Sequence, residues 1–252
     1  MKITIITPTF NSDKNIYKNI SSVSQQTYKN WEQIIIDNNS TDNTLPIINK
    51  FNEKKIKIIK EKDEGIFDAI NKGIINSSGE IISILHSDDF YHDNNVLNLI
   101  AETYKNVKSD IIYGNIIYVA ENTEKKILRY WKSGPYKKGL FFKGWSPPHT
   151  AFIVKKSIHE KYGYYDKKLG NSADFELMYR LLEKNQCDSH YIDKIMVTMR
   201  YGGESNKSLL KIVKQNLIVI KILNINNRPL KLIKFLFLKI LNRIKQIIYR
   251  PT

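Results

Sequence analysis

The sequence has one cysteine and no long apolar run, and each shortage excludes a class of protein. Cys187 has no second cysteine to pair with, which excludes an internal disulfide framework and fits a reducing compartment. No stretch is long enough and free enough of charge to cross a bilayer. The N-terminal MKITIITPTFN turns polar after a short apolar run, so it predicts a first strand and not a signal peptide. We therefore expect a cytoplasmic protein.

Acidic residues are missing from the C-terminal part of the chain. None follows Glu204, whereas lysines and arginines continue to Arg250, and the formal net charge of the whole chain is +15. A basic segment of this kind attracts polyanions or an anionic membrane surface. Because it carries few polar side chains that read bases, we expect no nucleic-acid partner.

From Pro229 onward, this basic segment places apolar residues at helical spacing. The apolar stripe comprises Leu230, Ile233, Phe237, Ile240, Leu241, Ile244, Ile247 and Ile248. The cations off the stripe are Lys231, Lys234, Lys239, Arg243 and Lys245. On the basic side, the pattern is interrupted by Leu232, Phe235 and Leu238. We expect a basic amphipathic helix immersed in an anionic membrane interface, with the protein peripheral on the inner face of the cell membrane. Docking of the helix on the rest of the chain, or on the partner in a homodimer, is the alternative.

Apolar strands and amphipathic helices alternate through the first part of the chain. Strands are expected within residues 2–10, 31–40, 56–65 and 80–89, and helices within 13–27, 41–54 and 66–79. This order predicts an α/β fold with a Rossmann-like, mostly parallel central sheet flanked by helices. Ligands of such sheets gather at the carboxyl ends of the strands.

Glycine-rich phosphate loops are absent from these strand ends. No Gly-x-Gly-x-x-Gly follows the first strand and no Gly-x-x-x-x-Gly-Lys-Ser/Thr occurs, which excludes a dinucleotide fingerprint and a P-loop. A bound diphosphate would need positive charge from elsewhere. A divalent cation held by Asp89 supplies it, because hard cations bind carboxylate and phosphate oxygens together.

Polar side chains follow three of the expected strands, and we expect them to share one site. They are Thr7, Thr9, Phe10 and Asn11 after the first strand, Asp37 after the second, and Asp88 and Asp89 after the fourth. Each also has a purely structural alternative. Asp88 and Asp89 suit the N-cap and first turn of a following helix, and Asp37 suits an Asx-turn.

Five segments, in order and spacing, resemble the inverting family 2 glycosyltransferases with the GT-A fold. They are TPTFN (7–11), IIIDNNSTDNT (34–44), DEGIFDAINKGIINSSGEII (63–82), LHSDDF (85–90) and SADFELMYRLL (172–182). The run DEGIFDAINKG looks most like the branch that builds bacterial surface polysaccharides such as O-antigen, capsule and colanic acid. The resemblance implies that Asp37 recognises the uracil of a UDP-sugar, that Asp89 holds Mg²⁺ or Mn²⁺, and that Asp88 lies near the ribose.

The expected helix at 66–79 adds three candidates on the donor side. Asp68, Asn71 and Lys72 lie at positions i, i+3 and i+4, so they share a helix face that could border the nucleotide and the sugar. The alternative is an ordinary solvated face.

The second half of the chain is expected to hold the acceptor. Trp145 and His149 flank a proline pair before an apolar strand, as in the family's acceptor stretch, so we expect both to contact the acceptor, although a lone histidine is more often structural. The segment 200–208 resembles the family's flexible Gly-Gly loop, which closes over the donor. Its alternative is a plain exposed turn.

A carboxylate must take the acceptor's proton in an inverting transfer. NSADFELMYRLLEKN offers Asp174 and Glu176, and Asp174 matches the family's base position. Asp174 also suits a helix N-cap, unless Ser172 provides the cap.

The residues together with the resemblance imply a metal-dependent inverting hexosyltransferase that uses a UDP-sugar and a lipid-linked saccharide, with undecaprenyl diphosphate as the expected lipid carrier. The expected domain layout is a catalytic domain at 1–205, with a nucleotide-sugar half at 1–115 and an acceptor half at 116–205, followed by a basic helical tail at 206–252. A sugar-nucleotide nucleotidylyltransferase and a basic nucleic-acid-binding protein are the alternatives.

Overall fold

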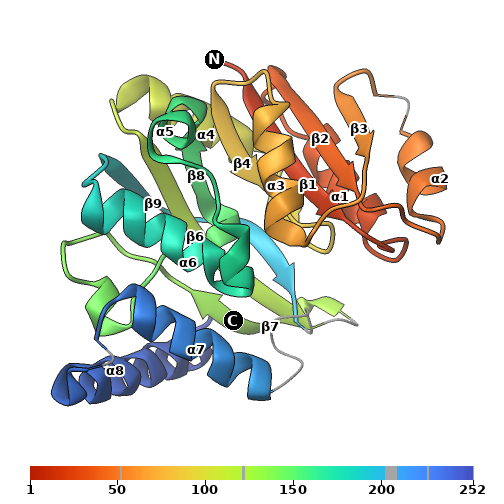
Figure 1. The fold of residues 1–252 in the computed structure, drawn as a ribbon. Helices are drawn as coiled ribbons and strands as arrows, with labels where there is room; N and C mark the ends of the chain where they lie inside the picture. The colour runs from red at the N-terminus through yellow and green to blue at the C-terminus, as the bar shows by residue number, and fades with distance from the viewer. Residues whose placement is uncertain (52, 121–122, 202–208, 226, 252) are drawn as a thin grey trace.

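A curled mixed sheet with helices on both faces forms the body of the computed structural model, which describes residues 1–252 apart from 52, 121–122, 202–208, 226 and 252 (Figure 1). The strands are β1 (Ile3–Thr9), β2 (Trp31–Asp37), β3 (Ile56–Lys60), β4 (Ile81–Ile84), β5 (Phe90–Tyr91), β6 (Ile111–Ala120), β7 (Thr123–Trp131), β8 (Phe152–Lys155) and β9 (Ser189–Arg200). The helices are α1 (Ile16–Ser24), α2 (Thr44–Asn49), α3 (Ile66–Ile75), α4 (Val96–Asn106), α5 (Lys156–Tyr162), α6 (Ala173–Tyr179), α7 (Leu209–Ile222) and α8 (Pro229–Ile248). Shorter 3₁₀ turns lie at Phe141–Lys143, His149–Ala151 and Lys167–Ser172, and a π-helical turn follows α6 at Arg180–Lys184.

The first four strands pair in parallel in the order β3-β2-β1-β4. The chain moves outward from β1 to β3 and then returns through α3 to the other side of β1, so the direction of strand addition reverses between β1 and β4. Crevices at such reversal points bind ligands in open α/β sheets. Register places Thr9 opposite Asp37 and Ile6 opposite Ile84, so the loops after β1, β2 and β4 leave the sheet at one edge.

Alternation along the strands explains why helices cover both faces. On β1, Ile6 packs into the cluster that also contains residues of α3 and α6, whereas Ile3 and Ile5 pack into the cluster that contains residues of α4. Successive strand residues point to opposite faces, so a strand whose seven residues are all buried is covered on both sides.

The second half extends the same sheet with mixed pairing. β8 lies antiparallel between β4 and β6, β9 runs parallel to β6, and β7 and β5 add antiparallel to β6 and β9. β6 spans both sides of the expected 115/116 boundary.

The C-terminal helices lie against the second half, on the opposite side of the molecule from β1–β3 (Figure 1). Phe235 of α8 is completely buried and belongs to the same hydrophobic cluster as Ile6 of β1, and Leu232 packs against that cluster. Our reading of Leu232 and Phe235 as residues immersed in a membrane was therefore wrong, because they form the docking face of α8. Within the described parts of the chain, no helix combines the length and apolar character needed to cross a membrane.

Candidate active site at the carboxyl edge of the sheet

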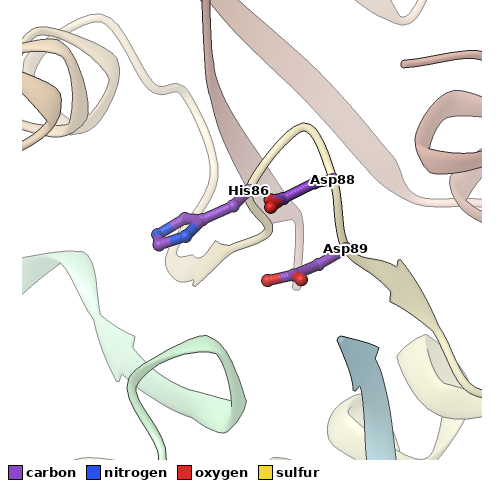
Figure 2. A group of neighbouring side chains, drawn as sticks. All are labelled: His86, Asp88 and Asp89. Atoms are coloured by element: carbon purple, nitrogen blue, oxygen red, sulfur yellow. The ribbon is translucent and has the colours of Figure 1, made fainter. Parts of the chain in front are cut away.

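The loop after β4 brings three potential metal ligands together. The ligand atoms of His86, Asp88 and Asp89 all lie within 4.8 Å of one another. All three side chains project to the same side of the loop (Figure 2). Because β5 separates Asp89 from α4, neither aspartate caps that helix, and the capping alternative is wrong.

Buried amides hold this loop in place. Asn19 of α1 donates from Nδ2 to the carbonyl oxygens of His86 at 2.7 Å and Asp89 at 2.9 Å. Its Oδ1 accepts from Nε2 of Gln33 at 2.9 Å, and the same Gln33 nitrogen lies 2.9 Å from Oγ1 of Thr7. Thr7 is therefore a buried structural link between the first two strands and the metal-ligand loop.

Asp89 is a buried carboxylate that the described residues compensate only in part. It is 1% exposed, and neither of its oxygens has a hydrogen-bond partner among the described residues. Burial raises the pKa of Asp89 well above its usual value and the neighbouring Asp88 raises it further, whereas the positive charge of Arg200 lowers it. An unpartnered buried carboxylate is costly, and a divalent cation ligated by its oxygens would remove that cost. The two carboxylates suit Mg²⁺ or Mn²⁺, and an imidazole ligand favours a transition metal over Mg²⁺.

His86 is a ligand candidate that the sequence analysis missed. Its Nε2 is buried without a hydrogen-bond partner in the described chain, and burial lowers its pKa, which favours the neutral, metal-binding form. The sequence signal was its position three residues before Asp89, at the end of a strand.

The loops after β1 and β2 form the neighbouring part of the edge. Asp37 is fully buried and accepts hydrogen bonds from the backbone N–H of Ser40 at 3.0 Å and its hydroxyl at 2.5 Å. The expected local turn is thus present, and it engages both oxygens of the Asp37 carboxylate. Asn11 accepts from the backbone N–H of Thr41 at 2.9 Å, while the ring of Phe10 is 56% exposed. The buried hydroxyl of Thr9 has no partner among the described residues.

The three candidates on α3 are tied to neighbouring protein groups. Asn71 exchanges two hydrogen bonds with the backbone of Tyr165, at 2.9 and 3.0 Å. Lys72 forms an ion pair with Glu61 at 2.9 Å and lies 3.4 Å from Asp68. Asp68 also pairs with Lys167 at 3.0 Å. They share a helix face as expected, and that face joins α3 to the segment before α6.

His149 lies beside the metal-ligand loop. Its ring is 5.6 Å from the ring of His86, and its Nε2 is 2.9 Å from the hydroxyl of Tyr165. Burial keeps the pKa of His149 well below its usual value. Trp145 lies elsewhere, because its Nε1 donates to the Ser133 carbonyl at 2.6 Å and its ring packs against Phe141.

Asp174 lies in the first turn of α6, and Glu176 is engaged elsewhere. Ser172 takes the N-cap position, although its hydroxyl points to the Gln215 carbonyl, 3.5 Å away. Glu176 forms an ion pair with Arg180 at 2.9 Å. Asp174 accepts from the Phe175 N–H at 2.6 Å, and burial raises its pKa to about 6.

Electrostatics relate Asp174 to the metal-ligand loop. Burial raises the pKa of Tyr118, and the charges of both Asp89 and Asp174 raise it further. Burial also raises the pKa of Tyr165, which bonds to His149, and the charge of Asp174 adds to that rise. Asp89 and Asp174 therefore both act on Tyr118, whereas only Asp174 acts on Tyr165. Most of the segment 200–208, expected to close over the donor, lies outside the described residues.

Several known proteins are similar to this chain in sequence. Residues 4–163 match the family model for glycosyl transferase family 2. A PGL/p-HBAD biosynthesis glycosyltransferase of Mycobacterium bovis is 26% identical over 207 residues, covering 80% of this chain and 78% of the relative. The UDP-Glc:alpha-D-GlcNAc-diphosphoundecaprenol beta-1,3-glucosyltransferase WfgD of Escherichia coli is 35% identical over 122 residues, covering 48% of each chain.

Solved structures show the same fold. The S. aureus TarS structure with UDP-GlcNAc superposes with a TM-score of 0.65 at 17% identity, covering 98% of this chain and 82% of that one. The mannosyltransferase PcManGT of Pyrobaculum calidifontis, with GDP-Man and Mn²⁺, gives a TM-score of 0.64 at 16% identity and covers 96% and 70%. With the reversal point of the sheet and the carboxylates at its edge, these matches confirm the expected fold and enzyme class: the chain belongs to glycosyl transferase family 2 and is a glycosyltransferase with the GT-A fold.

Proposed function

We propose that the protein transfers a hexose or N-acetylhexosamine from a UDP-sugar to a saccharide linked to undecaprenyl diphosphate, with inversion at the anomeric carbon. The observation that carries this is the unpartnered, buried Asp89 carboxylate at the reversal point of the sheet. The TarS structure contains UDP-GlcNAc, and the name of WfgD specifies a UDP-Glc donor and a diphosphoundecaprenol-linked acceptor. An acceptor of this kind fits the synthesis of a surface polysaccharide such as O-antigen or capsule.

Asp89 is the central metal ligand in this proposal, with Asp88 and His86 beside it. When bound, Mg²⁺ or Mn²⁺ would neutralise the diphosphate and the negative charge that UDP gains as the C1–O bond breaks. The Mn²⁺ in the PcManGT structure supports this choice of metal. Asn19 holds the loop carbonyls, so it orients the ligands as outer-shell partners do in metal sites.

The nucleotide would lie along the loops after β1 and β2. We assign Asp37 to the uracil and Asp88 to the ribose. Thr7 and Thr9, which lie at the end of β1 and not in the loop after it, and Phe10 and Asn11 of that loop are assigned to the surroundings of the nucleotide. Thr7 acts by holding Gln33, whereas the exposed ring of Phe10 is available for contact. Asp68, Asn71 and Lys72 would border the donor mainly by fixing α3 against the segment before α6.

Asp174 is the proposed base. The acceptor hydroxyl attacks the anomeric carbon from the side opposite UDP and passes its proton to the Asp174 carboxylate, while the bond from C1 to the diphosphate oxygen breaks. A base with a pKa near the working pH binds and releases that proton readily, and Asp174 has a pKa of about 6. His149 and Trp145 remain our assignments for the acceptor side.

The outward face of α8 is the proposed membrane contact. Large apolar side chains there are 44% to 82% exposed, and they include Leu230, Ile233, Phe237, Ile240, Ile244 and Ile248. No acidic residue occurs in α8. A homodimer through this face would therefore bring like charges together, whereas anionic lipid would neutralise them. This favours a cytoplasmic enzyme held at the inner membrane surface.

A substrate screen tests the reaction. UDP-Glc, UDP-Gal, UDP-GlcNAc and UDP-GalNAc would each be incubated with undecaprenyl-diphosphate-linked sugars and Mn²⁺ or Mg²⁺, and the products analysed by mass spectrometry and NMR. We expect transfer from one UDP-sugar that needs both metal and acceptor and gives a β-linkage. Transfer that persists in EDTA, or an α-linked product, would contradict the proposal.

A further inference from the structure

A cavity of about 400 Å³ lies between the C-terminal half of α8 and the body of the protein. It is separate from the metal-ligand loop. Four aromatic residues contribute to its wall, namely Tyr130, Trp131, Trp145 and Tyr249. Its volume falls in the range of small-molecule sites, roughly 300–1,000 Å³.

The cavity combines flat aromatic walls with six residues that have other polar side chains, namely Lys132, Ser133, Ser146, Asn242, Lys245 and Gln246. Lys132 is paired with Asp193 at 2.8 Å, whereas Lys245 pairs with no carboxylate in the described part of the chain. Ser146 also lines the cavity. Aromatic faces stack on the apolar faces of sugar rings, and an ammonium group attracts phosphate as a point charge. The lining therefore fits a sugar that carries a phosphate or diphosphate.

Packing contacts link the wall of this cavity to the region of the proposed base in two places: through the aromatic rings that begin at Trp145, and through Lys239 of α8, whose charge lowers the pKa of Asp174. The Trp145 ring is 5.5 Å from the Phe141 ring, which is 5.4 Å from the ring of Phe175, the residue after Asp174. Along α8, the backbone of Lys239 packs directly on Gly144, beside Trp145. The residues of α8 that line the cavity begin at Asn242, one turn or about 5 Å further along the helix.

The cavity also lies on the inward side of α8, because its lining residues share a helix face with buried Phe235, opposite the exposed apolar stripe. A helix is about 10 Å across. If the stripe rests on lipid, the cavity lies about one helix diameter above the membrane, between the lipid and Asp174.

We propose that this cavity binds the glycosyl diphosphate portion of the lipid-linked acceptor, with a sugar ring against the aromatic wall and a phosphate at Lys245. The inference rests on the proposed function, since it names the acceptor subsite of that reaction. Lys245 contacts the phosphate and sets the position of the acceptor, but it takes no part in proton transfer.

Binding of soluble probes tests the site without relying on transfer. The chain has three tryptophans, and two of them, Trp131 and Trp145, line the cavity, so ligand binding should change the intrinsic fluorescence. The probes are the octyl diphosphate ester of GlcNAc, GlcNAc 1-phosphate and the uncharged octyl glycoside of GlcNAc. We expect the diphosphate ester to bind most tightly, and the 1-phosphate to show whether the sugar phosphate binds without an alkyl chain.

Two variants separate the contribution of the cavity wall to probe binding from that of the Lys245 charge. Ser146→Phe fills the cavity and should weaken binding of all three probes at least tenfold. Lys245→Gln should weaken the two phosphorylated probes about fivefold or more and leave the octyl glycoside unchanged. The matched control is Lys231→Gln, an exposed lysine on nearly the same side of α8, 14 residues or about 21 Å away, which should bind all probes normally.

Several results would overturn the proposal. If the folded Ser146→Phe protein binds the probes as the parent does, the ligand binds elsewhere. If Lys231→Gln and Lys245→Gln weaken probe binding equally, the loss reflects the lower net charge of α8 and not a contact with Lys245. Failure of the proposed reaction is distinguishable, because no variant would then transfer sugar although the probes still bind. If both proposals hold, Lys245→Gln raises the acceptor KM and leaves the KM for the UDP-sugar unchanged.

Discussion

Arg180 forms an ion pair with Glu176, which lies one helical turn earlier in the chain, with Nε 2.9 Å from Oε1. The same guanidinium donates to the carbonyl oxygens of Gly163 at 3.1 Å and Tyr164 at 2.8 Å. Glu176 therefore fixes α6 against the preceding loop. Asp174, two residues earlier, is left as the first-turn carboxylate of α6 with a raised pKa.

Asp174→Asn should reduce kcat by about 10²-fold or more and keep UDP-sugar binding, because asparagine has nearly the same shape but accepts no proton. The matched control Glu176→Gln should be milder. In the parent enzyme, kcat/KM should fall as the pH drops through about 6, where Asp174 becomes protonated. Steady-state kinetics between pH 5 and 9 measure both effects. Greater damage from Glu176→Gln would show that the base is misassigned.

The same substitution should stabilise the protein at neutral pH. The pKa of Asp174 is raised in the folded state, so folding binds a proton, and the folded protein loses stability as pH rises from about 4 to about 6. Asp174→Asn removes that loss, with an expected gain of about 1–3 kcal/mol in the free energy of unfolding at pH 8 and little gain at pH 4. Urea denaturation at both pH values measures it. A gain of equal size at both would refute the ionisation argument.

Asp89→Ala should abolish transfer and the stabilisation by Mn²⁺. A cation that binds only the folded state raises Tm, so Mn²⁺ should raise the Tm of the parent and leave the variant unchanged. In EDTA the variant should be at least as stable as the parent, because it lacks a buried, unpartnered carboxylate. Asp93→Ala, an exposed acid four residues on, is the control. Full activity of Asp89→Ala in EDTA would remove the metal from the mechanism.

Asp37→Ala should raise the KM for the UDP-sugar about tenfold or more with little change in kcat, because base recognition binds ground and transition states equally. The backbone N–H and the hydroxyl of Ser40 both donate to the Asp37 carboxylate. Ser40→Ala therefore tests whether a change in the conformation of this loop is enough to raise the KM. An equal rise in KM in Ser40→Ala, or a change confined to kcat in Asp37→Ala, would argue against uracil recognition.

The double substitution of Phe237→Ser and Ile244→Ser should lower binding to anionic vesicles more than tenfold, since each side chain stays 44% or more exposed in the protein and would be buried in lipid. Point variants are preferable to truncation, because removal of α8 would also remove Phe235 from the core. Tyr17→Ser, an exposed aromatic on α1, is the control. Co-sedimentation with anionic and zwitterionic vesicles measures binding. Unchanged binding by the double variant would contradict membrane attachment.

Local sequence patterns were enough to predict the elements that depend only on neighbouring residues. Alternating apolar runs and helical spacing predicted β1 to β4 and the helices between them, and strand ends marked the loops that carry Asp37 and Asp89. These features follow from the periodicities of strand and helix, which need no knowledge of distant contacts. Their order and spacing also carried the family resemblance.

Contacts between residues far apart in the sequence could not be predicted in this way, because they depend on how the strands pair and the helices pack. His86 and His149 lie 63 positions apart in sequence, and their rings become neighbours because β8 pairs with β4. Phe235 was predicted in the membrane but is buried in the protein. A helical pattern tells which residues share a face, but it does not tell which face packs on the protein and which remains exposed. The cavity beside Trp145 likewise exists only because α8 returns to β7, and no local pattern encodes a contact across more than 90 residues.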